Sequence, residues 1–171
     1  MIFQNLTMAG FKSFAEKVEM DIDPGLTGIV GPNGCGKSNI VEAMRWIMGE
    51  SSARQMRGTE MDDIIFAGTE HRPARNLAEI LLKIDNSNRT APADFNNADE
   101  LEIIRKVQRG KGSNYLINGR PARAKDVQLL FADTASGARS SGIVSQGRIG
   151  AIVGAKPEYR RSLIEEAANI K

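Results

Sequence analysis

Cysteine, histidine and aromatic residues are scarce in this chain of 171 residues. One cysteine excludes an internal disulfide framework, and one histidine leaves too few ligands for a zinc cluster. Phe, Trp and Tyr make up only 5% of the residues, which argues against binding nucleic acid mainly by stacking bases on aromatic rings. The single cysteine and the single histidine both suit a reducing cytosol.

A strong net charge and long apolar runs are missing as well. The chain has 23 Lys and Arg residues against 21 Asp and Glu residues, a net charge of +2, so no global basic field marks a nucleic-acid binder, although local patches can exist. No apolar run approaches the ~20 residues needed to cross a bilayer, and the N-terminus lacks the pattern of a secretion signal. The sequence therefore predicts a soluble, cytoplasmic chain that does not associate with membranes, long enough for one domain.

Hydrophobic periodicity predicts both strands and helices, and hence an α/β fold class. The last helix opens with Pro157, which suits a first helical turn, and Asn118–Arg120 is a turn signal between extended segments. The predicted strands span residues 2–11, 17–23, 26–30, 76–86, 101–109 and 113–118, and the predicted helices run from 37 to a cap at 49, from 122 to 133 and from 157 to 171.

The most informative segment is G-P-N-G-C-G-K-S at residues 31–38, which matches the G-x-x-x-x-G-K-[ST] pattern of a phosphate-binding loop. Glycines let consecutive backbone N–H groups curl around an anion, and the next helix adds its positive N-terminal end. In this pattern Lys37 reaches the β- and γ-phosphates, and Ser38 places its hydroxyl on Mg²⁺. Because a strand before the loop and a helix after it are predicted independently, we interpret it as a site for ATP and Mg²⁺.

The groups that would complete ATP hydrolysis are harder to find. Hydrolysis also needs an acidic Mg²⁺ ligand, usually at the end of an apolar strand. Lys83 interrupts the apolar run that ends in Asp85, and the run that ends in Asp133 has helical spacing. Asp133 stays a candidate metal ligand, with an aspartate at the end of a helix as the alternative. The sequence therefore predicts a complete phosphate cradle and an incomplete catalytic site.

Six motifs occur in order along essentially the whole chain and together resemble the N-terminal part of the ATPase head of bacterial SMC (structural maintenance of chromosomes) proteins. The resemblance implies the N-terminal lobe of an ABC-type P-loop ATPase head over residues 1–156, with mixed and antiparallel strands packed around the P-loop helix. Residues 157–171 would begin a helix that leads to a coiled coil. The motifs are GFKSF (10–14), GPNGCGKSN (31–39), MRGTEMDDIIFAG (56–68), YLINGRPAR (115–123), IVSQGRI (143–149) and RRSLIEEAA (160–168).

The same resemblance implies a composite enzyme. In this family a C-terminal segment returns along the coiled coil and completes the head with the signature motif, the acidic Mg²⁺ strand and the catalytic Glu. Two heads then sandwich two ATP molecules, and a kleisin-type subunit and non-specific DNA are further partners. ATP binding would drive head engagement, and hydrolysis would drive DNA organisation in chromosome condensation and segregation on the nucleoid.

The family's motifs also assign roles to single residues. Lys37, Gln146 and Arg57 would act in catalysis, and Ser38 and Gln146 would hold Mg²⁺. The sequence by itself favours an ordinary loop amide at Gln146 and leaves a solvated loop arginine as the alternative at Arg57, with Arg54 a weaker candidate for its role. The residues expected to contact ATP are Lys12, Ser13, Pro32, Asn33, Gly34, Cys35, Gly36, Lys37, Ser38 and Asn39.

Basic residues concentrate in one part of the chain, between positions 105 and 125. On a hairpin and the following helix they could gather on one face and neutralise DNA phosphates without reading sequence, and an ordinary solvated surface is the alternative. These residues are Arg105, Lys106, Arg109, Lys111, Arg120, Arg123 and Lys125.

Three other functions compete with the SMC half-head. A compact P-loop kinase would need its own acidic metal site and a lid over its acceptor, and neither is found in the sequence. A coiled-coil DNA-repair ATPase shares the head, but the segments MRGTEMDDIIFAG and SQGRI favour chromosome organisation. A purely structural fragment would bind no nucleotide, which a titration with ATP and Mg²⁺ would reveal.

Overall fold

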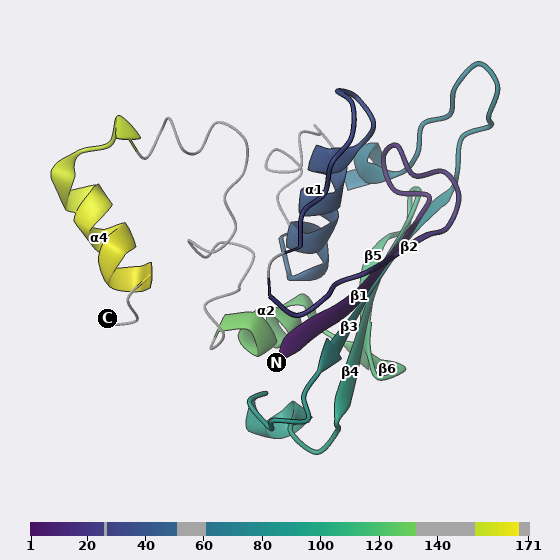
Figure 1. Cartoon of the computed structure of the whole chain (residues 1–171). Coiled ribbons are helices and arrows are strands. Elements are labelled where there is room, and N and C mark those ends of the chain that lie inside the picture. The colour runs from purple at the N-terminus through teal and green to yellow at the C-terminus, as the bar shows by residue number, and fades with distance from the viewer. Residues whose placement is uncertain (26, 51–60, 133–152, 168–171) are drawn as a thin grey trace.

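The computed structural model describes residues 1–25, 27–50, 61–132 and 153–167. Its centre is a six-stranded sheet in the order β2-β1-β3-β4-β5-β6, and every strand pair in it is antiparallel (Figure 1). The strands are β1 (Ile2–Ala9), β2 (Val18–Asp21), β3 (Leu77–Asp85), β4 (Glu100–Gln108), β5 (Gly112–Ile117) and β6 (Arg120–Ala122). The helices are α1 (Lys37–Ile47), α2 (Ala124–Ala132) and α4 (Pro157–Ala167), with short 3-10 helices η2 (Met61–Ile64) and η3 (Ala93–Phe95).

Helices α1 and α2 lie on the same face of this sheet (Figure 1). Alternation along β3 turns Ala78, Ile80, Leu82 and Ile84 toward that face, where all four are fully buried. The helices add their own apolar stripes to the same core, which includes Trp46 of α1 and Phe131 of α2. The P-loop helix is therefore packed directly against the central strands.

The other face of the sheet is half-exposed. Glu79, Leu81 and Lys83 alternate with the buried residues of β3 and are of intermediate exposure. Their register neighbours on β4, including Ile104, are of intermediate exposure as well. The sheet thus has a packed face that carries α1 and an open face that no described helix covers.

The predicted α/β fold class, with strands packed around the P-loop helix, is confirmed. The N-G pair forms the expected tight turn between β5 and β6, because Asn118 and Gly119 have φ values of 48° and 75°. Helix α4 begins at Pro157, as the sequence predicts. No helix in the described ranges combines the length and apolar character that a membrane span requires.

The strand predicted at 26–30 is wrong over its described part. Residues 27–30 have no regular structure, and the side chains of Ile29 and Val30 are 43% and 96% exposed. A strand needs a neighbour for its backbone N–H and C=O groups, and no described segment pairs with these residues. The apolar run therefore lacks the partner that would make it a strand.

Candidate nucleotide-binding site

The glycine-rich loop ends where helix α1 begins. Gly34 and Gly36 have φ values of 82° and 99°, in the left-handed region that favours glycine. A Cβ atom on Gly36 would lie 2.7 Å from the Ser13 hydroxyl, so a larger residue here would displace the Ser13 side chain. The first N–H groups of an α-helix have no acceptor within the helix, and α1 has no side-chain cap at its N-cap residue Gly36. The loop thus offers backbone donors at the positive end of α1, as an anion requires.

Lys37 lies over the same loop. Its ammonium donates to the carbonyl oxygens of Gly31 and Pro32, each at 2.6 Å, and its Nζ lies 3.8 Å from the Cys35 Sγ. A phosphate oxygen carries a full charge and forms a stronger bond with an ammonium than a neutral carbonyl does. The loop carbonyls hold the lysine beside the glycine loop.

The loop at residues 10–14 is fastened to the first turns of α1. The Asn39 side-chain amide donates to the Ser13 hydroxyl at 2.9 Å, and the Lys12 ammonium forms an ion pair with Glu42. The Lys12 and Glu42 side chains are only 13% and 9% exposed. Lys12 and Ser13 therefore lie beside the P-loop helix, and their contact with a nucleotide stays a prediction.

Arg105 holds the opposite end of α1, a role that the sequence analysis missed. It is 3% exposed, and its Nη1 donates to the carbonyl oxygens of Trp46 and Glu50, each at 2.6 Å. Its guanidinium carbon lies 4.3 Å from the centroid of the Trp46 ring and 4.7 Å from that of Tyr115. The Tyr115 hydroxyl also donates to the Trp46 oxygen, at 3.2 Å. The C-terminal carbonyls of α1 are thus tied to strands β4 and β5.

Burial controls the proton equilibria of this pair. It raises the pKa of Tyr115 to about 12, while the positive charge of Arg105 opposes that shift. Burial also lowers the pKa of Arg105 from its ordinary value, and the charge of Glu50 opposes that change. The phenol therefore stays protonated and able to donate to the Trp46 carbonyl at neutral pH.

The sequence contains a signal for the burial of Arg105, but not for the identity of its partners. It follows Leu101 and Ile103 and precedes Val107 in an alternating row, and all three of these neighbours are buried. The alternation therefore turned Arg105 toward the core, although its charge suggested a surface position.

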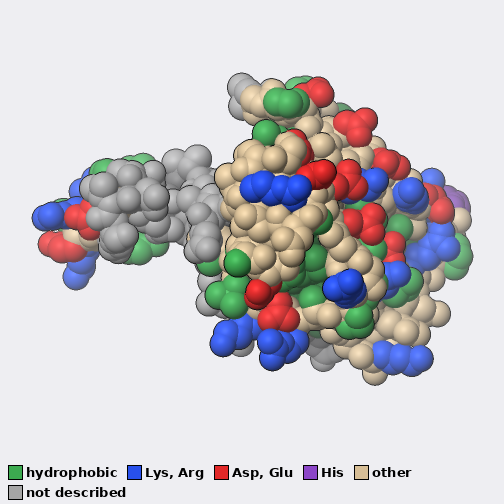
Figure 2. Space-filling view, turned by 90° about the horizontal axis from the view of Figure 1, so that it is seen from below, with side chains coloured by type: hydrophobic (Ala, Val, Ile, Leu, Met, Phe, Trp, Pro, Cys, Tyr) green, Lys and Arg blue, Asp and Glu red, His purple; other side chains and the backbone are tan. Residues whose placement is uncertain are grey.

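The predicted DNA-binding patch does not form as one surface. Arg105 is removed from it by burial, Lys106 is paired with Glu79, and Arg123 is paired with Asp126 at 3.1 Å. Figure 2 shows basic and acidic side chains interspersed over the face that it presents.

The remaining members of the patch fall into two groups. Arg109 and Lys111 lie at the β4–β5 turn, whereas Arg120 begins β6, opposite Ile117 at the other end of β5, and Lys125 lies in α2. The six residues of β5 separate Arg120 from the β4–β5 turn by about 20 Å. DNA contact by these four residues stays a prediction.

Some predicted site residues lie outside the described residues, namely Arg54, Arg57, Asp133 and Gln146. The run before Asp133 is helix α2, which agrees with its helical spacing and not with an acidic strand. No cluster of three or more His, Cys, Asp or Glu side chains suited to a metal ion is present in the described ranges.

Asp85 lies far from the phosphate loop. It pairs with Ile2 at one end of β1, whereas the loop at residues 10–14 follows the other end. The Ser87 backbone N–H donates to its carboxylate at 2.7 Å and lowers the pKa of Asp85. Asp85 is therefore a turn residue, and its place in the sheet separates it from a Mg²⁺ ion at Ser38.

The glycine loop at the start of α1 and the sheet beneath it have the architecture of a P-loop lobe. The chain belongs to the family described as the RecF/RecN/SMC N terminal domain, whose model matches residues 2–138.

The chain is similar to chromosome partition proteins and to SMC heads of known structure. A chromosome partition protein Smc from Rhodopseudomonas palustris is 59% identical over 170 residues, which are 99% of this chain and 15% of that protein. A structure described as "Structural biochemistry of ATP-driven dimerization and DNA stimulated activation of SMC ATPases" has a TM-score of 0.84 at 33% identity, covering 98% of this chain and 99% of its own. A second, "Crystal structure of the SmcHead bound to the C-winged helix domain of ScpA", has a TM-score of 0.88 at 34% identity, covering 97% of this chain and 50% of its own. The chain thus has the fold of SMC ATPase heads and spans about 15% of the relative's length.

Proposed function

We propose that this chain is the ATP-binding N-terminal half of an SMC head. The observation that carries the proposal is the phosphate cradle, in which Gly34 and Gly36 adopt positive φ at the start of α1 and the Lys37 ammonium lies over the loop. The backbone N–H groups of the loop would hold the phosphates, and Lys37 would exchange its carbonyl partners for phosphate oxygens.

The first turn of α1 also suits Mg²⁺. Ser38 is exposed there, and its hydroxyl is the hard oxygen ligand that Mg²⁺ prefers. Bound Mg²⁺ would neutralise charge on the phosphates. Gln146 and Arg57 are the further residues proposed to act on ATP, the first through Mg²⁺ and water and the second on the phosphates.

The other half of the head is proposed to supply what this chain lacks. The exposed apolar residues Ile29 and Val30, directly before the loop, support this view because they suit a strand whose partner comes from elsewhere. The chain also covers only half of the SMC head bound to ScpA. The C-terminal half would bring the signature motif, the acidic Mg²⁺ strand and the catalytic Glu.

The larger assembly is part of the same proposal. The similar structures include an ATP-driven SMC dimerisation and a head bound to ScpA, which support a second head and a kleisin-type subunit as partners. Helix α4 would lead into the coiled coil, and the division at residue 156 is proposed on that basis. ATP binding would engage two heads, and hydrolysis would drive DNA organisation in chromosome condensation and segregation on the nucleoid.

A coiled-coil DNA-repair ATPase is the second candidate, because the matching family model also covers RecF and RecN. The identity of 59% to a chromosome partition protein favours the SMC function. A structural fragment without nucleotide binding is the third candidate, and the loop geometry argues against it.

ATP turnover tests the proposal directly. We expect no turnover by this chain alone, turnover after mixing with a separately produced C-terminal half, and its loss with Lys37→Ala. If the chain alone hydrolyses ATP and the Lys37→Ala variant does not, the proposed division of catalysis between two halves is wrong. If neither the chain nor the mixture binds ATP, the nucleotide-binding function itself is wrong.

A further inference from the structure

A buried arginine in an apolar row of a sheet is unusual. Burial of a charge is costly unless the charge is paired and hydrogen-bonded, and an apolar side chain such as Ile103 or Val107 fills the neighbouring places in the row. Arg105 is compensated on several sides, since the Ser113 hydroxyl accepts from its Nε at 3.1 Å in addition to the two carbonyls and two rings. These contacts stabilise the buried charge of Arg105. An apolar side chain at this position would pack without needing them.

The partners of Arg105 show what the arrangement holds. Trp46 and Glu50 lie at and just beyond the C-terminal end of α1, where unpaired carbonyls give the helix a partial negative charge. Arg105 and Tyr115 are register partners on β4 and β5, and both donate to the Trp46 carbonyl. Strands β4 and β5 thus hold the C-terminal end of α1, and the N-terminal end of the same helix forms the phosphate cradle.

A small tilt of α1 at its C-terminal end would displace its N-terminal end, where the glycine loop lies. Helix α1 has 11 residues and is therefore about 16 Å long, so a tilt of about 4° at one end moves the other by about 1 Å. The N-terminal end is aligned with the loop at residues 10–14 through the bond between Asn39 and Ser13. A displacement of that size would disturb this alignment, and misplacements of about 1 Å can lower the rate of a catalysed reaction by about 100-fold.

We propose that Arg105 is a positioning residue for the nucleotide site: it fixes the C-terminal end of α1 against β4 and β5 and thereby holds the phosphate loop in its binding position. This role rests on the proposed ATP-binding function. It assigns to Arg105 a part in nucleotide binding without contact with the nucleotide.

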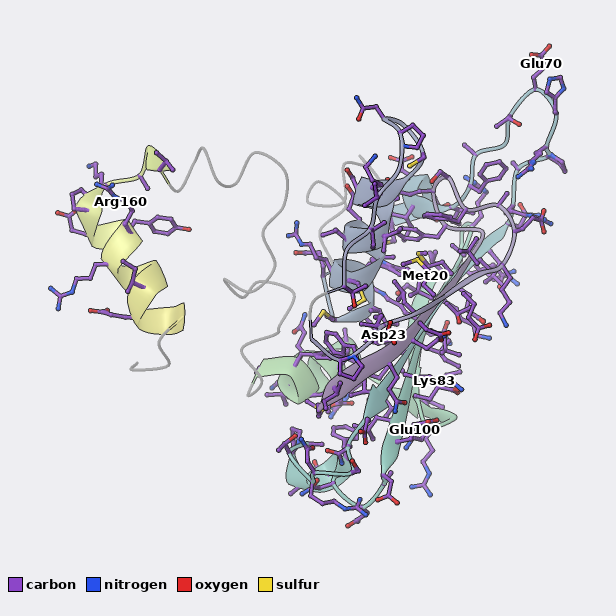
Figure 3. The ribbon with its side chains drawn as sticks, viewed as in Figure 1. Met20, Asp23, Glu70, Lys83, Glu100 and Arg160 are labelled. Atoms are coloured by element: carbon purple, nitrogen blue, oxygen red, sulfur yellow. The ribbon has the colours of Figure 1, made fainter. Side chains whose placement is uncertain are left out.

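The test compares variants of the complete 171-residue chain. Arg105→Met keeps an unbranched apolar stem, shorter than that of arginine, and removes the donors. Arg105→Lys keeps the charge with a smaller donor set, and Tyr115→Phe removes one hydroxyl. The matched control is Lys83→Met, the same kind of change on β3, where Lys83 lies on the side of the sheet away from α1 (Figure 3). Mg·ATP affinity is measured by titration calorimetry on the chain alone and on the head completed with its C-terminal half, with far-UV circular dichroism as the check of folding.

Trp46 provides a second measurement, because it is the only tryptophan in the chain and lies under the Arg105 guanidinium. We expect folded Arg105→Met to bind Mg·ATP about 10-fold more weakly, because a phosphate loop that is no longer held in place has to be ordered on binding, and to shift the Trp46 emission to longer wavelength. Arg105→Lys should recover part of the affinity, Tyr115→Phe should lose less than Arg105→Met, and Lys83→Met should stay within about twofold of the unchanged chain.

Two outcomes overturn the proposal in different ways. If the unchanged chain binds Mg·ATP and a folded Arg105→Met binds it equally well, Arg105 only stabilises the fold. If Arg105→Met does not fold, the same conclusion follows from folded Arg105→Lys and Tyr115→Phe variants with unchanged affinity. If the unchanged chain binds no Mg·ATP either alone or in the completed head, the proposed function fails and the positioning role fails with it.

Discussion

Helix α1 ends in two different ways. Its C-terminal carbonyls are buried and receive donors from Arg105, Tyr115 and the following backbone. Its N-terminal N–H groups follow an exposed glycine loop and have no side-chain cap. The comparison shows that one end of the helix is fixed by satisfied groups, whereas the other end presents donors that the proposed function assigns to an anion.

At the N-terminal end of α1, replacing Lys37 should have the largest effect on nucleotide affinity. Lys37→Ala removes a charged donor to the phosphates, and we expect Mg·ATP affinity to fall by about 10- to 100-fold. The lysine is half-exposed and bonds to loop carbonyls, so the urea midpoint of unfolding should change little. Titration calorimetry and urea denaturation measure the two effects. A large loss of stability with unchanged affinity would show that Lys37 supports the loop and does not bind phosphate.

Substitutions at the two glycines of the loop can distinguish backbone strain from steric crowding. A Cβ atom at Gly34 meets nothing within 4 Å, whereas at Gly36 it meets the Ser13 hydroxyl at 2.7 Å and the Phe14 ring at 3.1 Å. Both substitutions by Ala place a side chain at positive φ, which costs about 1–2 kcal/mol. We therefore expect Gly36→Ala to lower the free energy of unfolding and the Mg·ATP affinity more than Gly34→Ala does. Equal effects in urea denaturation and nucleotide titration would mean that the contact with residues 13 and 14 does not shape the loop.

The contribution of Tyr115, at the C-terminal end of α1, should be measurable as a change in stability at high pH. Burial raises the pKa of Tyr115 from 10.0 in an exposed phenol to about 12, so the folded chain keeps the proton where the unfolded chain loses it. The stability that depends on this proton is present below pH 10.0 and is lost as the pH rises toward about 12. The urea midpoint should therefore fall over this range in the unchanged chain and fall less in Tyr115→Phe. Tyr159→Phe is the control, since Tyr159 is 51% exposed, and it should keep the full slope.

The smallest effect is expected at helix α2. Its N-terminal end has the side-chain partner that the N-terminal end of α1 lacks. The Arg123 N–H and guanidinium both donate to Asp126, and these bonds lower the pKa of the carboxyl. The carboxylate's contribution to stability is present above its ordinary pKa of 3.8 and is lost as the pH falls through the lowered value. Asp126→Asn should lower the melting temperature by only about 2 °C at neutral pH and not at low pH. A loss that is equal at both pH values would exclude the charge as the cause.

The sequence predicted the cradle because the cradle is local. Its residues lie within one short stretch, and the backbone angles of Gly34 and Gly36 are what the spacing of the motif requires. The strands and helices with a clear period were also predicted correctly, including β3, β4, α1 and α2. These features depend on the order of neighbouring residues and need no knowledge of distant partners.

The errors concern residues whose neighbours are far away in sequence. The apolar run at 27–30 has strand composition, but a strand also depends on a partner that no described segment supplies. The basic residues between 105 and 125 are close in sequence, yet the fold buries Arg105, pairs others with acidic residues and places Arg120 at the opposite end of β5 from Arg109 and Lys111.

By itself, the sequence determined that this protein has a phosphate loop at the start of a helix in an α/β lobe, because short-range spacing encodes both. Only the tertiary structure shows that Arg105 binds the C-terminal end of that helix, since its carbonyl partners lie 59 and 55 residues away in sequence. A charge in an alternating row can face water or the core, and only the packed partners make the core the favourable choice.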